Sequence, residues 1–317
     1  MRGVVAAALI LFAEALLAQP FPARPVRVIV PFTPGGVTDS LARLHAGKLA
    51  ELWGQSVVVE NRPGAGGSLG AAVVARAPAD GYMLLVHSSG YAINAAANPK
   101  LPYDYKKDFV DVAPLGSQPM VLVVSPASGI RSVDALIKRA REKPGEIAYG
   151  SAGIGSGAHF NSEKFRIAAG VELLHVPYKG GADAINDTMA GRLTFTFNTV
   201  TLALPFIRDG RLLALGVSSR TRSELLPNVA PIAEAGIPGF EFTFWNGLWA
   251  PAGTPAAIVE RINRDVMRLM DMPDVLERLS KLGAEPMRMS PAEFARFVKS
   301  EIEDSARIAQ AAGIKAQ

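Results

Sequence analysis

Short apolar runs alternate with stretches of helical periodicity along most of this chain, and no other feature restricts the fold as strongly. Leu41, Leu44, Leu49 and Leu52, for example, lie on one face of a helix between two such runs. Short runs of consecutive apolar residues are typical of strands that are buried on both faces. The runs cover residues 26–30, 57–60, 82–86, 121–124, 146–149, 173–176, 194–197 and 212–217. We therefore predict an α/β fold with a largely parallel sheet.

The C-terminal third has a different pattern, because from Thr254 onward the sequence predicts helices only. Thr254 and Pro255 are placed as N-cap and first residue of one helix. Ser290, Pro291 and Glu293 have the spacing of a capping box at the start of another. We expect these helices to pack on a sheet that earlier residues build.

The N-terminus has the shape of a signal peptide. Arg2 precedes an apolar run over residues 3–17, and Ala18 offers a small residue for cleavage. Glu14 interrupts the run, and Leu16 stands where a small residue is preferred. A membrane anchor is the alternative, but the run is shorter than the roughly 20 residues that span a bilayer. We predict a signal peptide over residues 1–18 and export to the periplasm.

Composition narrows the function classes. The chain has no cysteine, which excludes disulfides, thiolate metal sites and cysteine nucleophiles. Its net charge is +4, but the cations are dispersed among acidic residues, so we expect no nucleic-acid partner. The four histidines, at positions 45, 87, 159 and 175, lack the spacing of a local metal site. We expect no metal and no other cofactor.

The first strand leads into a turn, Pro31 to Gly36, that is suited to binding an anion. Gly35 and Gly36 let the backbone turn sharply and expose successive N–H groups. Thr38 or Asp39 is expected to cap the following helix, whose N-terminus adds a partial positive charge. An ordinary strand-to-helix turn needs glycine as well, and that alternative stays open.

A second glycine-rich turn, from Gly150 to His159, also opens a helix. Gly153, Gly155 and Ala158 satisfy the spacing of a dinucleotide-binding turn, which favours a dehydrogenase that binds NAD. The next strand should then end in an acidic residue for the ribose, but Pro177, Tyr178 and Lys179 follow it. The dehydrogenase therefore stays as an alternative only.

The chain resembles the receptors of tripartite tricarboxylate transporters, the TctC or Bug type of periplasmic binding protein. Eight segments carry the resemblance, in order and nearly over the whole chain after the leader: RPVRVIVPFTPGGVTDSLAR, GQSVVVENRPGAGGSLGA, ADGYMLL, LPYDYKKDF, YGSAGIGSGAHF, HVPYKGGADA, LPNVAPIAEAGIPGFE and WNGLWAPAGTP.

The resemblance implies a type II periplasmic-binding-protein fold, with two α/β lobes joined by crossover strands and the ligand in a cleft between them. Residues 24–120 and 244–317 would form one lobe and residues 121–243 the other. The crossovers would fall near residues 117–124 and 241–247.

The resemblance also implies a carboxylate site built largely from backbone amides and ordered waters. Its residues in this sequence would be Phe32, Thr33, Gly35, Gly36, Thr38, Asp39, Ser88, Ser89, Gly155, Ser156, His159, Tyr178, Lys179 and Asn198. By residue type alone, Asp39 is expected as a helix cap rather than as a ligand contact. If Tyr91 faces the cleft, an aromatic or bulky carboxylate would be favoured, whereas a core or surface position would leave the solute open.

These features together predict a receptor rather than an enzyme. It would be a monomer that closes on a small carboxylate and presents it to the membrane subunits of a transporter. A sensor that reports the solute to a signalling partner is an alternative within the same fold.

Overall fold

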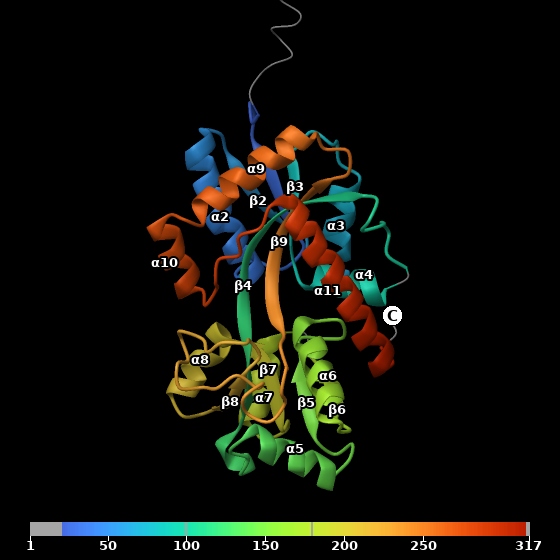
Figure 1. The fold of residues 1–317 in the computed structure, drawn as a ribbon, viewed down its shortest axis with the longest axis vertical. Coiled ribbons are helices and arrows are strands. Elements are labelled where there is room, and N and C mark those ends of the chain that lie inside the picture. The colour runs from blue at the N-terminus through green and yellow to red at the C-terminus, as the bar shows by residue number, and fades with distance from the viewer. Residues whose placement is uncertain (1–20, 99, 179, 315–317) are drawn as a thin grey trace, which may run out of the picture.

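The computed structural model describes residues 21–98, 100–178 and 180–314 (Figure 1). The predicted signal peptide and Lys179 lie outside the described residues. The strands are β1 (Val26–Val30), β2 (Val57–Asn61), β3 (Met83–Ser88), β4 (Phe109–Val124), β5 (Ala148–Ser151), β6 (Leu174–Pro177), β7 (Phe195–Thr199), β8 (Leu213–Val217) and β9 (Thr243–Pro251). The helices are α2 (Val37–Trp53), α3 (Ser68–Ala75), α4 (Gly90–Ala97), α5 (Val133–Glu142), α6 (Gly157–Ala169), α7 (Gly181–Met189), α8 (Val200–Arg208), α9 (Ala256–Leu269), α10 (Pro273–Lys281) and α11 (Pro291–Ala312), with short 3-10 turns at Ala65–Gly67 and Pro126–Ser128.

The first lobe is built on strands in the order β2-β1-β3-β9-β4. β1 pairs in parallel with β2 and β3, whereas β9 runs antiparallel to both β3 and β4. Helices α2, α9 and α10 cover one side of this sheet, and α3, α4 and α11 lie on the other (Figure 1). One core lies under α2 and α9, and a second, aromatic core centres on Trp245, Trp249 and Phe294.

The second lobe repeats this order as β6-β5-β7-β4-β8. β5 pairs in parallel with β6 and β7, and β4 now supplies the antiparallel strand between β7 and β8. Each lobe therefore has the same arrangement, in which β1 corresponds to β5, β2 to β6 and β3 to β7. Because the carboxyl ends of parallel strands meet at one edge of a sheet, the turns after β1, β3, β5 and β7 are brought together where the lobes face each other.

Two long strands, β4 and β9, connect the lobes (Figure 1). The first part of β4 pairs with β9 in one lobe, and its last residues, Met120–Val124, pair with β7 and β8 in the other. Helix α11 starts on the first lobe and ends beside α6 of the second lobe (Figure 1). There, Ala309 of α11 and Phe160 of α6 pack with Ile93 of α4. The fold is the two-lobed α/β fold that the sequence predicts, with crossovers at both expected places.

Most predicted strands lie within two residues of those observed, but the two crossover strands are longer than the sequence indicates. The predicted run at residues 121–124 is only the end of a 16-residue strand. The earlier part was not recognised, because Pro114, Gly116 and Pro119 interrupt its apolar pattern. The predicted cap at Thr254 is wrong. The Thr254 hydroxyl donates to the Pro251 carbonyl at 2.7 Å, and Pro255 is the N-cap of α9. The capping box at Ser290 and Glu293 is confirmed.

Candidate functional site

Two strand-to-helix turns meet between the lobes. The first joins β1 to α2 through residues 31–36, and the second joins β5 to α6 through residues 152–156. Their N-cap residues, Gly36 and Ser156, have nearly the same backbone angles, with φ and ψ of −74° and 169° in the first and −73° and 157° in the second. The two turns therefore approach their helices along the same path.

The residue before each N-cap is a glycine in the left-handed region, with φ of +84° at Gly35 and +80° at Gly155. Only glycine adopts this region without strain. In each turn, the N–H of this glycine donates to the side chain at the third position of the helix. Gly35 donates to Asp39 Oδ2 at 2.9 Å, and Gly155 donates to His159 Nδ1 at 3.2 Å.

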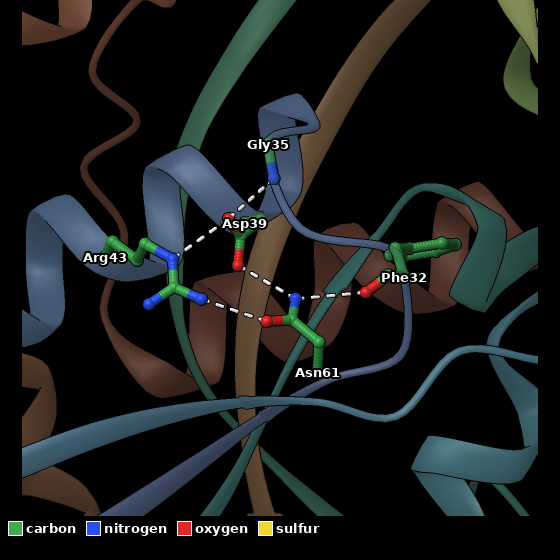
Figure 2. A network of polar contacts seen from close by, with 5 residues as sticks. All are labelled: Phe32, Gly35, Asp39, Arg43 and Asn61. Atoms are coloured by element: carbon green, nitrogen blue, oxygen red, sulfur yellow. Dashed lines mark hydrogen bonds and ion pairs between the residues drawn. The ribbon is translucent and has the colours of Figure 1, made fainter.

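Asp39 holds the first turn through a network that Figure 2 shows. Its carboxylate accepts hydrogen bonds from Gly35, from Arg43 Nε at 3.0 Å and from Asn61 Nδ2 at 2.8 Å, and Asn61 also donates to the Phe32 carbonyl. Burial works to raise the pKa of Asp39, but the bonds from Arg43, Gly35 and Asn61 outweigh it and lower this pKa below its usual value. Asp39 is therefore a buried anion that fixes the turn.

His159 holds the second turn as a neutral group. Its ring stacks on His175 with centroids 4.0 Å apart, and His175 Nε2 lies 2.7 Å from Ser151 Oγ. Burial, followed by the nearby His175, lowers the pKa of His159 to about 3. Because Nδ1 accepts the Gly155 N–H, the imidazole carries its proton on Nε2.

The two helix starts differ in how their N–H groups are satisfied. Ser156 Oγ accepts from the His159 N–H at 3.2 Å, so α6 is capped by its own sequence. Gly36 has no side chain, so the equivalent N–H of α2, that of Asp39, has no acceptor among the described residues. The first two N–H groups lack an acceptor in both helices, those of Val37 and Thr38 in α2 and those of Gly157 and Ala158 in α6. The predicted cap at Thr38 or Asp39 is therefore wrong, because Asp39 bonds back to Gly35 and Thr38 Oγ1 donates to Asn246 Oδ1. The start of α2 is the better place for an external anion.

The turn after β3 lies beside these two turns, and Ser88 and Gly90 line the same cavity as they do. Ser88 Oγ accepts from the Gly90 N–H at 3.3 Å, at the start of α4. Ser89 donates its N–H to the Trp245 carbonyl of β9, while its buried hydroxyl finds no partner among the described residues.

A cavity of about 510 Å³ lies between these turns and has walls from both lobes. Pockets of this size accommodate small organic ligands. It brings together eight of the predicted site residues: Phe32, Thr33, Gly36, Thr38, Ser88, Gly155, Ser156 and Asn198.

Five predicted site residues do not line this cavity. Gly35, Asp39 and His159 lie within or behind the turns and hold them in shape, and Ser89 is buried beneath them. Tyr178 points its hydroxyl to Asp187 at 2.6 Å, and burial followed by this contact raises the pKa of Tyr178 to about 12. The remaining predicted site residue, Lys179, lies outside the described residues.

The sequence missed much of the apolar wall of the cavity. Met120 and Phe244 come from the crossover strands, and Ile154 and Leu202 come from the second turn and from α8. A Cβ atom on Gly157 would lie 2.9 Å from Phe244 Cδ2, so the glycine at the start of α6 is what lets β9 pass so close. Tyr91 is not part of this wall, since it is buried and stacks on Trp249 at 4.3 Å in the core of the first lobe.

No group of three or more possible metal ligands occurs in the described part of the chain. Pro177 ends β6, so the acidic residue that a dinucleotide site needs at this strand end is not there. No helix within the described ranges is both long and apolar enough for a membrane span.

A cavity between two α/β lobes, with helix N-termini at its walls, defines a solute-binding protein of the periplasmic type. The family model "Tripartite tricarboxylate transporter family receptor" matches residues 41–314. The chain belongs to this family and is a receptor, not an enzyme.

Individual proteins support this assignment. BugT of Bordetella pertussis is 37% identical over 300 residues, which cover 94% of this chain and 92% of BugT. The structure of Rpa4515 from R. palustris with adipate matches with a TM-score of 0.84 and 38% identity, and covers 93% of this chain and 99% of that one. MatC from Rhodopseudomonas palustris with bound malate matches with a TM-score of 0.79 and 34% identity, and covers 91% and 99%. The resemblance found in the sequence is confirmed.

Proposed function

We propose that this receptor binds a small carboxylate between its two turns, with the carboxylate at the start of α2. The observation that carries the proposal is the contrast between the helix starts. Ser156 accepts the His159 N–H of α6, whereas Gly36 cannot cap α2, so that the N–H groups of Val37, Thr38 and Asp39 all lack an acceptor among the described residues. A carboxylate there would accept these N–H groups and meet the partial positive charge of a 17-residue helix. Thr33, Thr38 and Ser88 also line the cavity.

The matched structures supply independent support. One contains adipate and another contains malate, and both ligands are small carboxylates. We propose that the carboxylate of this chain's solute is recognised by N–H and hydroxyl groups of the turns that correspond between the lobes.

We propose the remaining parts of the function from the fold and the family together. Residues 24–120 and 244–317 would move as one lobe and residues 121–243 as the other, with β4 and β9 as the hinge. The monomeric receptor would close on its solute in the periplasm and present it to membrane subunits of a transporter. No observation favours the sensor alternative or a nucleic-acid partner.

A calorimetric and thermal-shift screen tests the proposal with adipate, malate, hexanoate and NAD as probes. At least one carboxylate is expected to raise the melting temperature, because a ligand that binds only the folded state stabilises it. A shift with NAD and none with any carboxylate would overturn the proposal.

The position of the site is tested with Gly36→Leu. The backbone of Gly36 is extended, and a Cβ atom there would meet only the Thr33 carbonyl, at 3.8 Å, so the fold tolerates the change. The leucine would fill the start of α2 and is expected to abolish binding. Gly47→Leu is the matched control, since Gly47 lies in the same helix with nothing within 4 Å of its added Cβ. Equal affinity of both variants would remove the first turn from the site.

A further inference from the structure

The cavity has one polar end and one apolar wall. The polar end consists of the backbone N–H groups at the starts of α2 and α6 and of the loop after β3. The large apolar side chains of the lining are Phe32, Met120, Ile154, Leu202 and Phe244, of which Phe32 and Ile154 belong to the two turns and the others to the crossovers and α8. A ligand with a polar head and an apolar body would match this division.

Two of these side chains are unusually exposed. Ile154 is 50% exposed and Leu202 is 39% exposed, and they are two of the seven large apolar residues exposed in the described part of the chain. Both lie on the wall of the cavity, on separate elements of the second lobe. Apolar surface that gathers inside a cavity favours ligands that cover it.

The described lining contains no Arg, Lys, His, Asp or Glu side chain. The cation nearest along the first turn, Arg43, bonds to Asp39 and Asn61 instead. One carboxylate can be satisfied by N–H and hydroxyl groups at the start of α2. A second carboxylate against the apolar wall would lose water without gaining a cation, which is unfavourable.

Hydroxylated ligands meet the same difficulty. A hydroxyl group that faces Ile154, Leu202 or Phe244 would leave its hydrogen-bonding capacity unused in the bound state. The amides of Asn198 and Asn94, which also line the cavity, already use part of their hydrogen-bonding capacity, because Asn198 Nδ2 donates to Thr196 Oγ1 and Asn94 Nδ2 donates to the Gly66 carbonyl.

We infer that the preferred solute is a monocarboxylate with an apolar body, aliphatic or aromatic, whose body lies against Ile154, Leu202 and Phe244. The inference rests on the proposed function and narrows it. It also separates this receptor from the matched proteins that hold adipate or malate, since those ligands have two carboxylates.

Isothermal titration calorimetry with matched probes tests the inference. Hexanoate and adipate have the same six-carbon chain and differ in the second carboxylate, while benzoate and malate represent an aromatic and a hydroxylated acid. Hexanoate and benzoate are expected to bind at least tenfold more tightly than adipate and malate. Equal or tighter binding of adipate would overturn the inference and leave the proposed function intact, whereas binding of none of the four acids would contradict the proposed function itself.

Substitutions on the apolar wall provide a second test. Leu202→Asn and Ile154→Asn are each expected to weaken hexanoate binding at least fivefold and to reduce the ratio of hexanoate to adipate affinity. Ile167→Asn and Leu174→Asn are matched controls, because these residues are 40% and 52% exposed and lie outside the cavity. All four residues are exposed, so the unliganded melting temperature should change little. Unchanged hexanoate affinity in both cavity variants would contradict the inference.

Lys179→Gln completes the test. Lys179 lies outside the described residues but only two residues before Gly181, which lines the cavity, so the variant tests whether this cation binds a second carboxylate. The preference for hexanoate is expected to persist in this variant. A preference for adipate in the original chain that disappears in Lys179→Gln would identify a cation for a second carboxylate and overturn the inference.

Discussion

The turns at residues 31–36 and 152–156 follow the same backbone path into their helices, yet the groups that hold them have different charge. In the first, the anion Asp39 accepts the N–H of Gly35, whereas in the second the neutral ring of His159 accepts the N–H of Gly155. We call Asp39 and His159 the braces of the first and second turn. Each brace also contacts the next strand of its own lobe: Asp39 accepts a hydrogen bond from Asn61 of β2, and His159 stacks on His175 of β6. The common requirement is therefore an acceptor that fixes the glycine, and charge is free to vary.

The difference that bears on ligand binding lies at the N-cap residue, one residue after the left-handed glycine of each turn. Ser156 caps its own helix, while Gly36 leaves the start of α2 without a cap. A turn that satisfies its own N–H groups has less to offer an anion. The comparison therefore assigns the carboxylate mainly to the first lobe, and the second lobe supplies much of the apolar wall.

The largest expected effect breaks the first brace. Asp39→Ala leaves three donors, on Gly35, Arg43 and Asn61, without their acceptor, and should lower the free energy of unfolding by roughly 3 kcal/mol. Ligand affinity should fall with it, because the turn loses its shape. Urea unfolding measures the first effect and calorimetry the second.

Asp80→Ala serves as the control for that variant. Asp80 forms an exposed ion pair with Arg24 at 2.8 Å, with the side chains 41% and 60% exposed, and exposed pairs contribute little. If Asp39→Ala were no more destabilising than Asp80→Ala, the buried network would not be what fixes the first turn.

As the pH falls, the second brace, His159, should lose its contribution to stability at a higher pH than the first brace, Asp39. The folded-state pKa of His159 is about 3, below the usual 6.5, so the unfolded chain takes up this proton first. Its contribution to stability is fully present above pH 6.5 and is lost as the pH falls from 6.5 towards 3. Between pH 7 and pH 5 the loss amounts to about 2 kcal/mol. The pKa of Asp39 is lowered from 3.8, so the contribution of Asp39 is lost only below about pH 4.

His159→Asn isolates this effect, because an asparagine at this position can still accept the Gly155 N–H and does not titrate. The original chain should lose about 2 kcal/mol more than the variant between pH 7 and pH 5 in urea unfolding. His45 and His87 are buried in both proteins, and burial lowers the pKa of each to about 4, so they form a shared background. Parallel pH profiles for the two proteins would show that His159 is not the neutral brace described here.

The smallest effect is expected for the substitution that makes the first turn resemble the second. Gly36→Ser introduces a cap at the start of α2, which should change the stability by only a few tenths of a kcal/mol. The serine hydroxyl would compete with the ligand for the same N–H groups, and affinity should fall about tenfold, which corresponds to about 1.4 kcal/mol. Titration of hexanoate into both proteins measures this change, and a gain in affinity would contradict the assignment of the carboxylate to α2.

The sequence patterns were sufficient to predict the parallel strands and the two turns, because buried strands and glycine-rich strand ends are local features. The division into two lobes came from the resemblance to the family. The apolar wall depends on pairings that are distant in sequence, as when Gln118 of β4 lies opposite Phe244 of β9. Residue type also misled at Asp39, whose carboxylate was expected near the ligand or as a helix cap. Arg43 is its i,i+4 neighbour on α2, but the bond from Asn61 becomes evident only when β2 lies beside β1.

Amide chemical shifts test the central claim most directly. In a titration of the ¹⁵N-labelled protein with hexanoate, the amides of Val37 and Thr38 should show the largest changes, and those of Gly157 and Ala158 should follow with the same dissociation constant. This result would place one ligand against both helix starts, with its carboxylate at α2. Saturation with hexanoate that leaves Val37 and Thr38 unmoved, while amides elsewhere shift, would contradict the account.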